Sequence, residues 1–185
     1  LTNRRLRLRA LQRSTQGGPD RAALANWGNE IERWRDAHGI YRKPCYDNSG
    51  PLIMPQDVIK CLHEVTAGNA FVTSDVGQHQ MWVAQRYPFQ RPNTHITSGG
   101  LGAMGFAVPA AMGVHLARPD EPVWAISGDG GFQMNMAEIA TMVQEGLEVK
   151  LAIFNNGYLG MVRQWQQFFH GGRYSSTPIW SPDYV

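Results

Sequence analysis

The stretch Ile126-Ser127-Gly128-Asp129-Gly130-Gly131-Phe132, ISGDGGF, stands between an apolar run and a segment with helical spacing. Glycines between a strand and a helix usually let the backbone approach another group closely. An aspartate among such glycines needs a chemical reason. The rest of the chain suggests both the fold around this turn and the task of its carboxylate.

Short apolar runs alternate with longer helix-like segments on both sides of this turn. The expected strands cover 70–76, 95–98, 122–127 and 149–154, and the expected helices cover 55–67, 79–87, 102–117, 134–146 and 158–169. Strands that alternate with helices indicate βαβ crossovers and a parallel sheet covered on both faces. The sequence therefore predicts an α/β fold of three layers, a parallel sheet with helices on both faces.

The first 50 residues differ from the rest and are interpreted as a linker with one amphipathic helix. That helix is expected over 19–36, where Leu24, Trp27, Ile31 and Trp34 recur at 3-4-3 spacing. Five arginines between residues 4 and 13 are interpreted as part of a solvated linker rather than a binding arm. Residues 51–185 form the main predicted domain. The chain lacks an initiator Met and a complete last unit, so we expect a fold truncated at both ends.

Composition narrows the function classes. Only 17% of the 185 residues are charged, which predicts that part of the surface is covered by a partner or another domain. A net charge of +2 gives no argument for nucleic acid, and no apolar run is long enough to cross a membrane. The two cysteines lack metal-site spacing, which favours a reduced, cytoplasmic protein.

Two expected strand ends carry oxygen ligands. Asp129 follows one strand, and Asn155 and Asn156 follow the next. Ligands of open parallel sheets bind beyond the carboxyl ends of the strands, so these side chains are expected to be neighbours. A carboxylate and a carboxamide suit Mg²⁺ or Ca²⁺, and Mg²⁺ commonly adds phosphate oxygens to its coordination. The sequence therefore predicts that Asp129 holds a metal and that the metal holds a diphosphate, which the glycine backbone approaches.

Other interpretations of the glycine turn can be compared with the sequence. A Walker loop needs Gly-Lys-Ser/Thr, and no lysine follows this turn. A Rossmann fingerprint needs a glycine at position 133, which is Gln133. The remaining alternative is a tight turn whose aspartate caps the next helix. The Gly-Asp-Gly sequence alone would favour that alternative, but the paired asparagines at the second strand end favour the metal.

Four motifs in order resemble one family: SDVGQHQMW, TSGGLGAMGFAVPAAMG, GDGGFQMN and NNGYLGMVRQWQ. Together they resemble the thiamine-diphosphate-binding domain of acetolactate synthase (acetohydroxyacid synthase) large, catalytic subunits. The resemblance covers about residues 51–185. It implies the thiamine-diphosphate-binding fold and a thiamine-diphosphate- and Mg²⁺-dependent transferase. The implied reaction is carboligation of pyruvate with a second 2-ketoacid, which yields acetolactate or acetohydroxybutyrate in branched-chain amino acid biosynthesis.

The resemblance also assigns residues. It implies that Asp129, Asn156 and Tyr158 (by its carbonyl) are metal ligands, and that Trp165 lines the substrate entrance. Spacing alone favours a core stripe for Trp165, together with Met161 and Phe168. The residues implied to bind the cofactor are Val76, Gln78, His79, Gly102, Met104, Gly128, Asp129, Gly130, Gly131, Met134 and Asn156. No catalytic residue is expected in this chain, because in the family the activating glutamate belongs to an N-terminal domain.

Further properties follow only from the resemblance. The full-length enzyme is expected to be a flavoprotein with FAD, a homodimer or larger, and to have a regulatory small subunit. Pyruvate and 2-ketobutyrate are the expected substrates, and this chain alone is expected to be inactive. The alternatives are another thiamine-diphosphate enzyme, such as pyruvate oxidase, glyoxylate carboligase or the catabolic acetolactate synthase, or a non-catalytic nucleotide- or metal-binding module.

Overall fold

A computed structural model describes residues 20–38 and 52–185 of the chain. The chain divides into two units, residues 1–47 and 48–185, and each is considered by itself. Two predictions lie outside the described residues: the arginine-rich linker at residues 4–13 and the domain boundary after residue 50.

The described part of the first unit is the helix α2, Arg21–His38, close to the predicted helix over 19–36. Asp20 begins it, because its carboxylate accepts hydrogen bonds from the Ala22 and Ala23 amides at 2.9 and 3.1 Å. Trp27 and Trp34 meet edge to face on this helix, with ring centroids 5.4 Å apart. Within residues 20–38 and 52–185, no helix combines the length and apolar character needed to cross a membrane.

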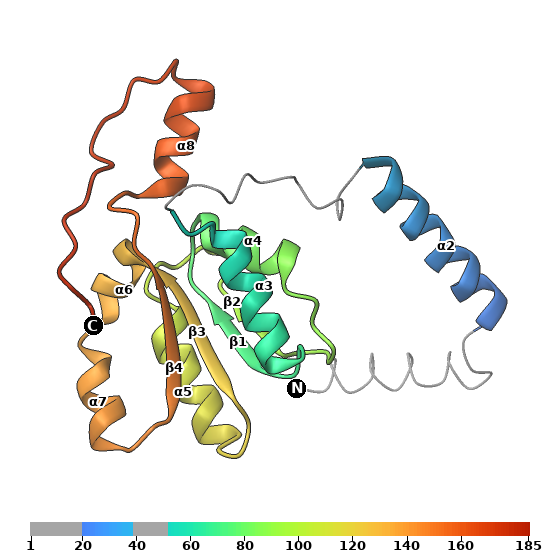
Figure 1. The fold of residues 1–185 in the computed structure, drawn as a ribbon, viewed down its shortest axis with the longest axis horizontal. Helices are drawn as coiled ribbons and strands as arrows, with labels where there is room; N and C mark the ends of the chain where they lie inside the picture. Colours follow the sequence, from blue (N-terminus) through green and yellow to red (C-terminus); the bar gives the residue numbers. More distant parts are fainter. Residues whose placement is uncertain (1–19, 39–51) are drawn as a thin grey trace, which may run out of the picture. The chain divides into compact units, whose positions relative to one another are not determined.

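The second unit is built on a parallel sheet. Its strands are β1 (Phe71–Ser74), β2 (His95–Thr97), β3 (Val123–Gly128) and β4 (Val149–Phe154), in the order β2-β1-β3-β4. In the register, Ser74 pairs with Thr97 and Ile126, and Gly128 pairs with Phe154. The carboxyl ends of all four strands therefore lie at one edge of the sheet (Figure 1).

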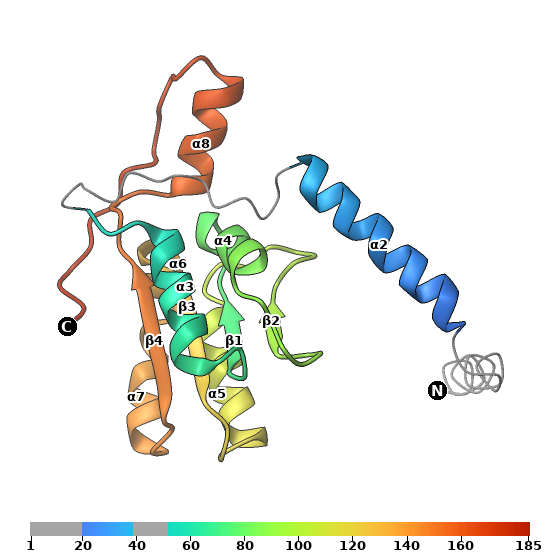
Figure 2. The ribbon, with the colours of Figure 1, turned by 45° about the vertical axis from the view of Figure 1, so that its right-hand side comes forward.

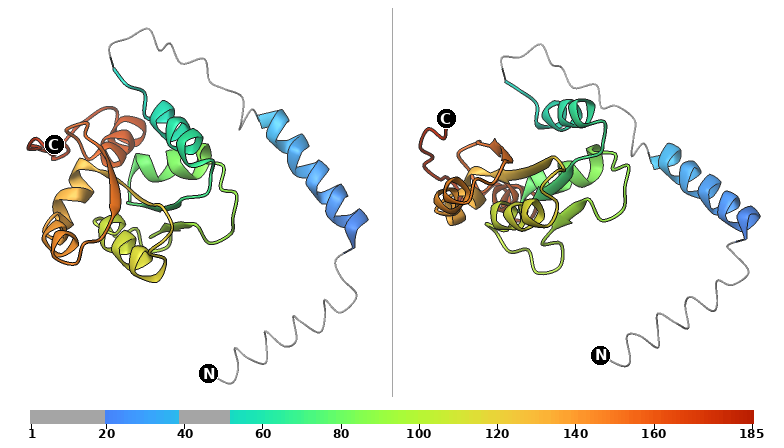
Figure 3. Two further views of the ribbon diagram at one scale, coloured as in Figure 1. Left: turned by 60° about the horizontal axis from the view of Figure 1, so that its bottom comes forward. Right: turned by 90° about the horizontal axis from the view of Figure 1, so that it is seen from below.

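Helices cover both faces of this sheet, as predicted (Figures 2 and 3). On one face, α3 (Pro55–Thr66) and α4 (Gln78–Arg86) pack on Val72 and Ile126. On the other face, α5 (Ala107–Ala117), α6 (Asp129–Asn135) and α7 (Glu138–Gln144) pack on alternate strand residues, among them Ala125 and Leu151. This alternation confirms the predicted three-layer α/β fold, because successive strand residues point to opposite faces.

Two predicted helix boundaries were wrong. The helix expected over 102–117 begins only at Ala107, because residues 102–105 form a turn in which Gly102 and Gly105 have φ values of 67° and 84°. The helix expected over 134–146 is two helices, and the first begins at Asp129 inside the glycine turn itself. The last helix, α8, covers Gly160–Phe169, beyond the carboxyl ends of the strands (Figure 1).

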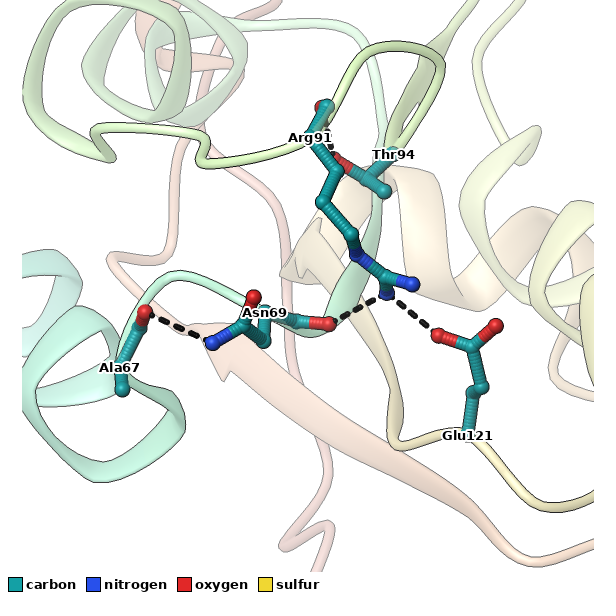
Figure 4. Close-up of polar contacts among 5 residues, drawn as sticks. All are labelled: Ala67, Asn69, Arg91, Thr94 and Glu121. Atoms are coloured by element: carbon teal, nitrogen blue, oxygen red, sulfur yellow. Dashed lines mark hydrogen bonds and ion pairs between the residues drawn. The ribbon is translucent and has the colours of Figure 1, made fainter.

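An ion pair joins the opposite, amino-terminal ends of the strands (Figure 4). Arg91 pairs with the part-exposed carboxylate of Glu121 and donates to the Asn69 carbonyl at 2.7 Å. Its guanidinium also lies 5.4 Å from the centre of the Phe71 ring. The hydrogen bond from Arg91 holds the pKa of Glu121 below its ordinary value of 4.5, against a smaller opposing effect of desolvation. Arg91 thus connects the loop before β2 to the starts of β1 and β3.

We predict that Glu121→Gln lowers the melting temperature at neutral pH, and that this difference shrinks as the pH falls. A carboxyl group with a lowered pKa stabilises the fold at pH values above 4.5, which is its pKa in the unfolded chain. This contribution is lost as the pH falls through the lowered pKa of the folded protein. Thermal unfolding of both proteins from pH 7 down to pH 3 measures the effect. Glu148→Gln is the control, because it makes the same charge change at an exposed position away from Arg91. A destabilisation by Glu121→Gln that stayed constant over this range would contradict the prediction.

Candidate functional site

Loops from three strands meet at the carboxyl edge of the sheet. Asp75 follows β1, Asp129 follows β3, and Asn155 follows β4. Because β1, β3 and β4 are adjacent in the sheet, side chains that are 54 residues apart in sequence (Asp75 and Asp129) reach the same region. The predicted proximity of the two turns after β3 and β4 is confirmed, since the Gly157 amide donates to the Asp129 carboxylate at 2.7 Å.

Asp129 is only 2% exposed at the start of α6. Its carboxylate accepts hydrogen bonds from its neighbour Gly130 at 3.0 Å, from the Gly157 amide, and from the Ser181 hydroxyl at 3.3 Å. These donors fix the orientation of the carboxylate, and none of the three carries a positive charge. In the described residues, no arginine or lysine forms an ion pair with Asp129.

The segment 177–181 holds the loop after β4 in place. The Leu159 amide donates to the Thr177 carbonyl at 2.8 Å, and the Ile179 amide donates to the Gly157 carbonyl at 2.9 Å. Next to these bonds, the Asn156 side-chain oxygen accepts from the Tyr158 amide at 2.9 Å. The loop is therefore braced on the side of Asp129, and Asn156 lies exposed beside it.

A pocket of about 190 Å³ opens between these loops. Most of the predicted site residues line it: Val76, Gln78, His79, Gly102, Met104, Gly128, Asp129, Gly130, Gly131, Asn156 and Tyr158. The rest of the wall was not predicted and consists of Gly77, Trp82, Phe154, Leu159, Gly160, Met161 and Val162. Most of these additional residues are apolar or glycine in loops and helix faces, so their types alone carried no signal for a site.

Met134 and Trp165 do not line the pocket. Met134 is 58% exposed and lies beside the turn at Gly105. Trp165 is 60% exposed on α8, where it contacts Phe169 edge to face at 5.6 Å. The interpretation of Trp165 as part of a core stripe was wrong, because α8 has no buried residue. The structure leaves both side chains accessible next to the pocket.

His79 is a buried histidine at the wall of the pocket, 7% exposed, and its Nε2 atom has no hydrogen-bond partner. Its ring stacks on Phe154 with centroids 6.5 Å apart. Burial lowers the pKa of His79 below 6.5, although the nearby carboxylates of Asp75 and Asp129 act in the opposite direction. A buried polar atom without a partner is costly, so Nε2 is well suited to bind a polar group in the pocket.

Glycines allow the loops to approach one another. A Cβ atom on Gly160 would lie 2.4 Å from the side-chain oxygen of Gln78, which donates its own amide to Gln164 at 2.9 Å. This contact joins the start of α4 to the start of α8, and a larger residue at position 160 would displace the Gln78 side chain.

Asp75 is a site residue that the sequence analysis missed. It is 1% exposed and lies behind the pocket wall, where its carboxylate accepts from Gly105 and Ser127. The sequence did contain one indication of its role. An acidic residue directly after a buried strand is itself buried, so its carboxylate needs hydrogen-bond donors. The sequence did not indicate which partners it would find.

The donor set allows one kind of metal site. Across residues 20–38 and 52–185, no three His, Cys, Asp or Glu side chains gather as a ligand group. A metal at Asp129 would therefore take one carboxylate, amide or carbonyl oxygens, and oxygens from a ligand. This set is typical of Mg²⁺, which needs few protein carboxylates.

Comparisons with known proteins give a consistent result. The family described as "Thiamine pyrophosphate enzyme, C-terminal TPP binding domain" matches residues 75–185. The chain is 47% identical over 163 residues to the acetolactate synthase isozyme 3 large subunit of Escherichia coli, covering 88% of this chain and 28% of that protein. It is 50% identical over 146 residues to the acetolactate synthase large subunit of Corynebacterium glutamicum, covering 76% and 23%.

A third relative is the acetolactate synthase large subunit of Haemophilus influenzae, 43% identical over 173 residues, with 92% of this chain and 29% of that protein covered. The chain thus spans less than a third of the length of the curated relatives that it matches.

We predict that the ligand-free chain loses stability as the pH falls below 6.5, and that His79→Gln reduces this loss. A histidine with a lowered pKa stabilises the fold at pH values above 6.5, which is its pKa in the unfolded chain. This contribution disappears as the pH falls through the lowered pKa of the folded protein. One proton changes the slope by at most about 1.4 kcal/mol per pH unit.

Denaturant unfolding from pH 8 to pH 5 measures the slope. Burial also lowers the pKa of His95, so His95→Gln serves as the comparison variant. The titration of His95 accounts for pH dependence that remains in the His79→Gln protein. A His79→Gln protein with the full slope of the unmutated chain would contradict the prediction.

Proposed function

Because this chain belongs to the thiamine pyrophosphate enzymes, whose C-terminal TPP-binding domain matches residues 75–185, we propose that its pocket binds the diphosphate of thiamine diphosphate together with Mg²⁺. The observation that carries the proposal is the buried Asp129 carboxylate, which is held by three uncharged donors and faces a pocket lined by glycines. A buried carboxylate without a cation is costly, and a divalent ion bridged to a diphosphate would remove that cost.

Asp129, the side-chain oxygen of Asn156 and the carbonyl of Tyr158 would hold the metal. Asn156 lies two residues beyond the end of β4, and its loop is already bonded to Asp129 through the Gly157 amide. The Asn156 oxygen accepts one bond from the Tyr158 amide and keeps a second lone pair for an ion. All three groups are oxygen donors, which Mg²⁺ prefers.

Gln78 and His79 would contact the diphosphate, with the backbone of Gly128, Gly130 and Gly131. The unpartnered Nε2 of His79 supports this role, because in the neutral ring it can donate to a phosphate oxygen. Gly102 and Met104 would bind the aminopyrimidine through their backbone atoms, with Val76 beside them in the wall. Met134 lies just outside the pocket wall, and we propose that it supports the bent cofactor.

The reaction proposed for the whole enzyme is the carboligation of pyruvate with pyruvate or 2-ketobutyrate, giving acetolactate or acetohydroxybutyrate for branched-chain amino acid synthesis. The similarity to acetolactate synthase large subunits supports it. When bound, thiamine diphosphate would supply an electron sink for the electron pair that stays on the carbonyl carbon of pyruvate when carbon dioxide leaves. The residues of this chain orient the cofactor and exclude water, and the exposed Trp165 contacts the second 2-ketoacid.

The full-length enzyme is proposed to be a cytoplasmic flavoprotein with FAD, at least a homodimer, with a regulatory small subunit. The resemblance to the family supports FAD, the homodimer and the small subunit, and the two cysteines without metal-site spacing support the location. The resemblance also assigns the glutamate that activates the aminopyrimidine to another domain. This chain is therefore proposed to be the cofactor-binding part of the enzyme.

We expect Asp129→Ala to abolish saturable binding of Mg²⁺–thiamine diphosphate, because it removes the only carboxylate of the proposed ligand set. Tryptophan fluorescence of the 185-residue chain, titrated with thiamine diphosphate in the presence of Mg²⁺ or EDTA, measures this binding. Asp120→Asn is the matched control, since Asp120 is exposed just before β3 begins, at the opposite edge of the sheet. Binding that survives in Asp129→Ala or in EDTA would refute the proposed metal site.

A second prediction concerns activity. The chain alone should form no detectable acetolactate from pyruvate with Mg²⁺ and thiamine diphosphate present, because the activating glutamate is expected elsewhere. The same assay on a full-length enzyme that contains this domain provides the positive control. Acetolactate produced by the purified chain would overturn this part of the proposal.

A further inference from the structure

The Asp75 carboxylate makes an unusual number of bonds for a residue outside the pocket wall. It accepts from the Val76 amide at 2.7 Å, from the Gly105 amide with both oxygens at 2.9 and 3.1 Å, and from the Ser127 hydroxyl at 2.8 Å. Its own amide donates to the Ile126 carbonyl at 2.8 Å. In the described residues, no lysine or arginine pairs with it.

These partners belong to different sides of the pocket. Gly105 closes the 102–105 turn, whose residues Gly102 and Met104 line the pocket. Ser127 lies near the end of β3, two residues before Asp129. Asp75 therefore fastens the turn on one side to the strand that carries Asp129 on the other.

Two more contacts support this arrangement. The Asn135 side-chain amide donates to the Gly105 carbonyl at 2.7 Å, so α6 also holds this turn. A Cβ atom on Gly131 would lie 2.4 Å from an oxygen of Asp75, so the glycine gives the carboxylate its space. The first half of the turn is exposed and bonded to Ser98, whose carbonyl and hydroxyl accept from the Gly102 and Ala103 amides at 3.0 Å each, so Asp75 and Asn135 hold its second half at Gly105.

We propose that Asp75 is a positioning residue, which fixes the 102–105 turn at the distance from Asp129 that thiamine diphosphate requires. The inference rests on the proposed function. Loss of the carboxylate frees the Gly105 amide and lets the turn move, while the loop around Asp129 keeps its own bonds to Gly130, Gly157 and Ser181. Asp75 thus acts on the organic part of the cofactor and leaves the binding of the metal and diphosphate almost unchanged.

The test compares two ligands on the 185-residue chain by calorimetric titration in Mg²⁺: thiamine diphosphate and inorganic diphosphate. Inorganic diphosphate can use only the Asp129 half of the pocket. Asp75→Ala should weaken thiamine diphosphate about tenfold, as expected when a buried donor loses a charged acceptor. It should change the affinity for inorganic diphosphate by less than about twofold, because the loop around Asp129 keeps its own hydrogen bonds.

Two further variants separate positioning from folding. Asp75→Asn keeps an acceptor oxygen for the amides of Val76 and Gly105, so it should restore most of the preference for thiamine diphosphate. Ser127→Ala removes the side-chain bond to β3, but the Asp75 amide keeps its bond to the Ile126 carbonyl of that strand and the Gly105 bond stays intact, so this variant should keep that preference. The melting temperature of each variant is measured in parallel.

An equal loss of affinity for both ligands, or no loss for either, would overturn the role of Asp75. Failure of Asp75→Asn to restore the preference would overturn it as well. If the unmutated chain binds neither ligand, the proposed function itself fails, and the role of Asp75 fails with it before any variant is tested. If the unmutated chain binds both ligands equally, the 102–105 turn has no cofactor contact to position, and only the inference about Asp75 is refuted.

Discussion

The buried Asp75 carboxylate joins the pieces of backbone on which the pocket depends. Parallel strands place their loops at one edge of a sheet, but the strands do not bond those loops to one another. Here a single carboxylate with several lone pairs accepts from Val76 in the loop after β1, from Gly105 in the 102–105 turn and from Ser127 near the end of β3. A neutral hydroxyl would offer fewer acceptor sites, and an apolar residue would offer none. One side chain therefore ties the turn that contains Gly102 and Met104 to the strand that precedes Asp129.

Two buried carboxylates determine the charge around the pocket. Asp75 and Asp129 are both almost fully buried, and burial favours the neutral form of His79 between them. Uncharged amides and hydroxyls hold the two carboxylates, so the described residues supply no cation to balance them. Such a site favours a divalent ion strongly and repels a free diphosphate. Metal and diphosphate therefore fit this pocket best as one complex, in which the ion offsets the charge of Asp129, while the donors from Val76, Gly105 and Ser127 stabilise that of Asp75.

The sequence predicted the parts of this protein that follow from local pattern. Alternation of apolar runs and helical spacing predicted the layers, and the ends of β3 and β4 predicted that Asp129 and the loop of Asn156 would be neighbours. Contacts between distant segments could not be predicted in this way. Asp75 finds partners 30 and 52 residues away, and nothing in its local sequence identifies Gly105 or Ser127 as those partners. The early start of α6 at Asp129 also depends on such contacts, since glycines disfavour a helix.

Trp165 illustrates how one pattern supports two opposite interpretations. The spacing of Met161, Trp165 and Phe168 is the same for a helix stripe buried in a core and for one that awaits a ligand. The structure separates them, because Trp165 and Phe168 are 60% and 64% exposed on a helix without a buried residue. Exposed aromatic rings on a helix whose first turn lines the pocket cannot be explained by packing within this unit. A Trp165 ring buried in the core could not contact an incoming 2-ketoacid. The exposure of this ring therefore excludes the core stripe and is required for the proposed contact with the substrate.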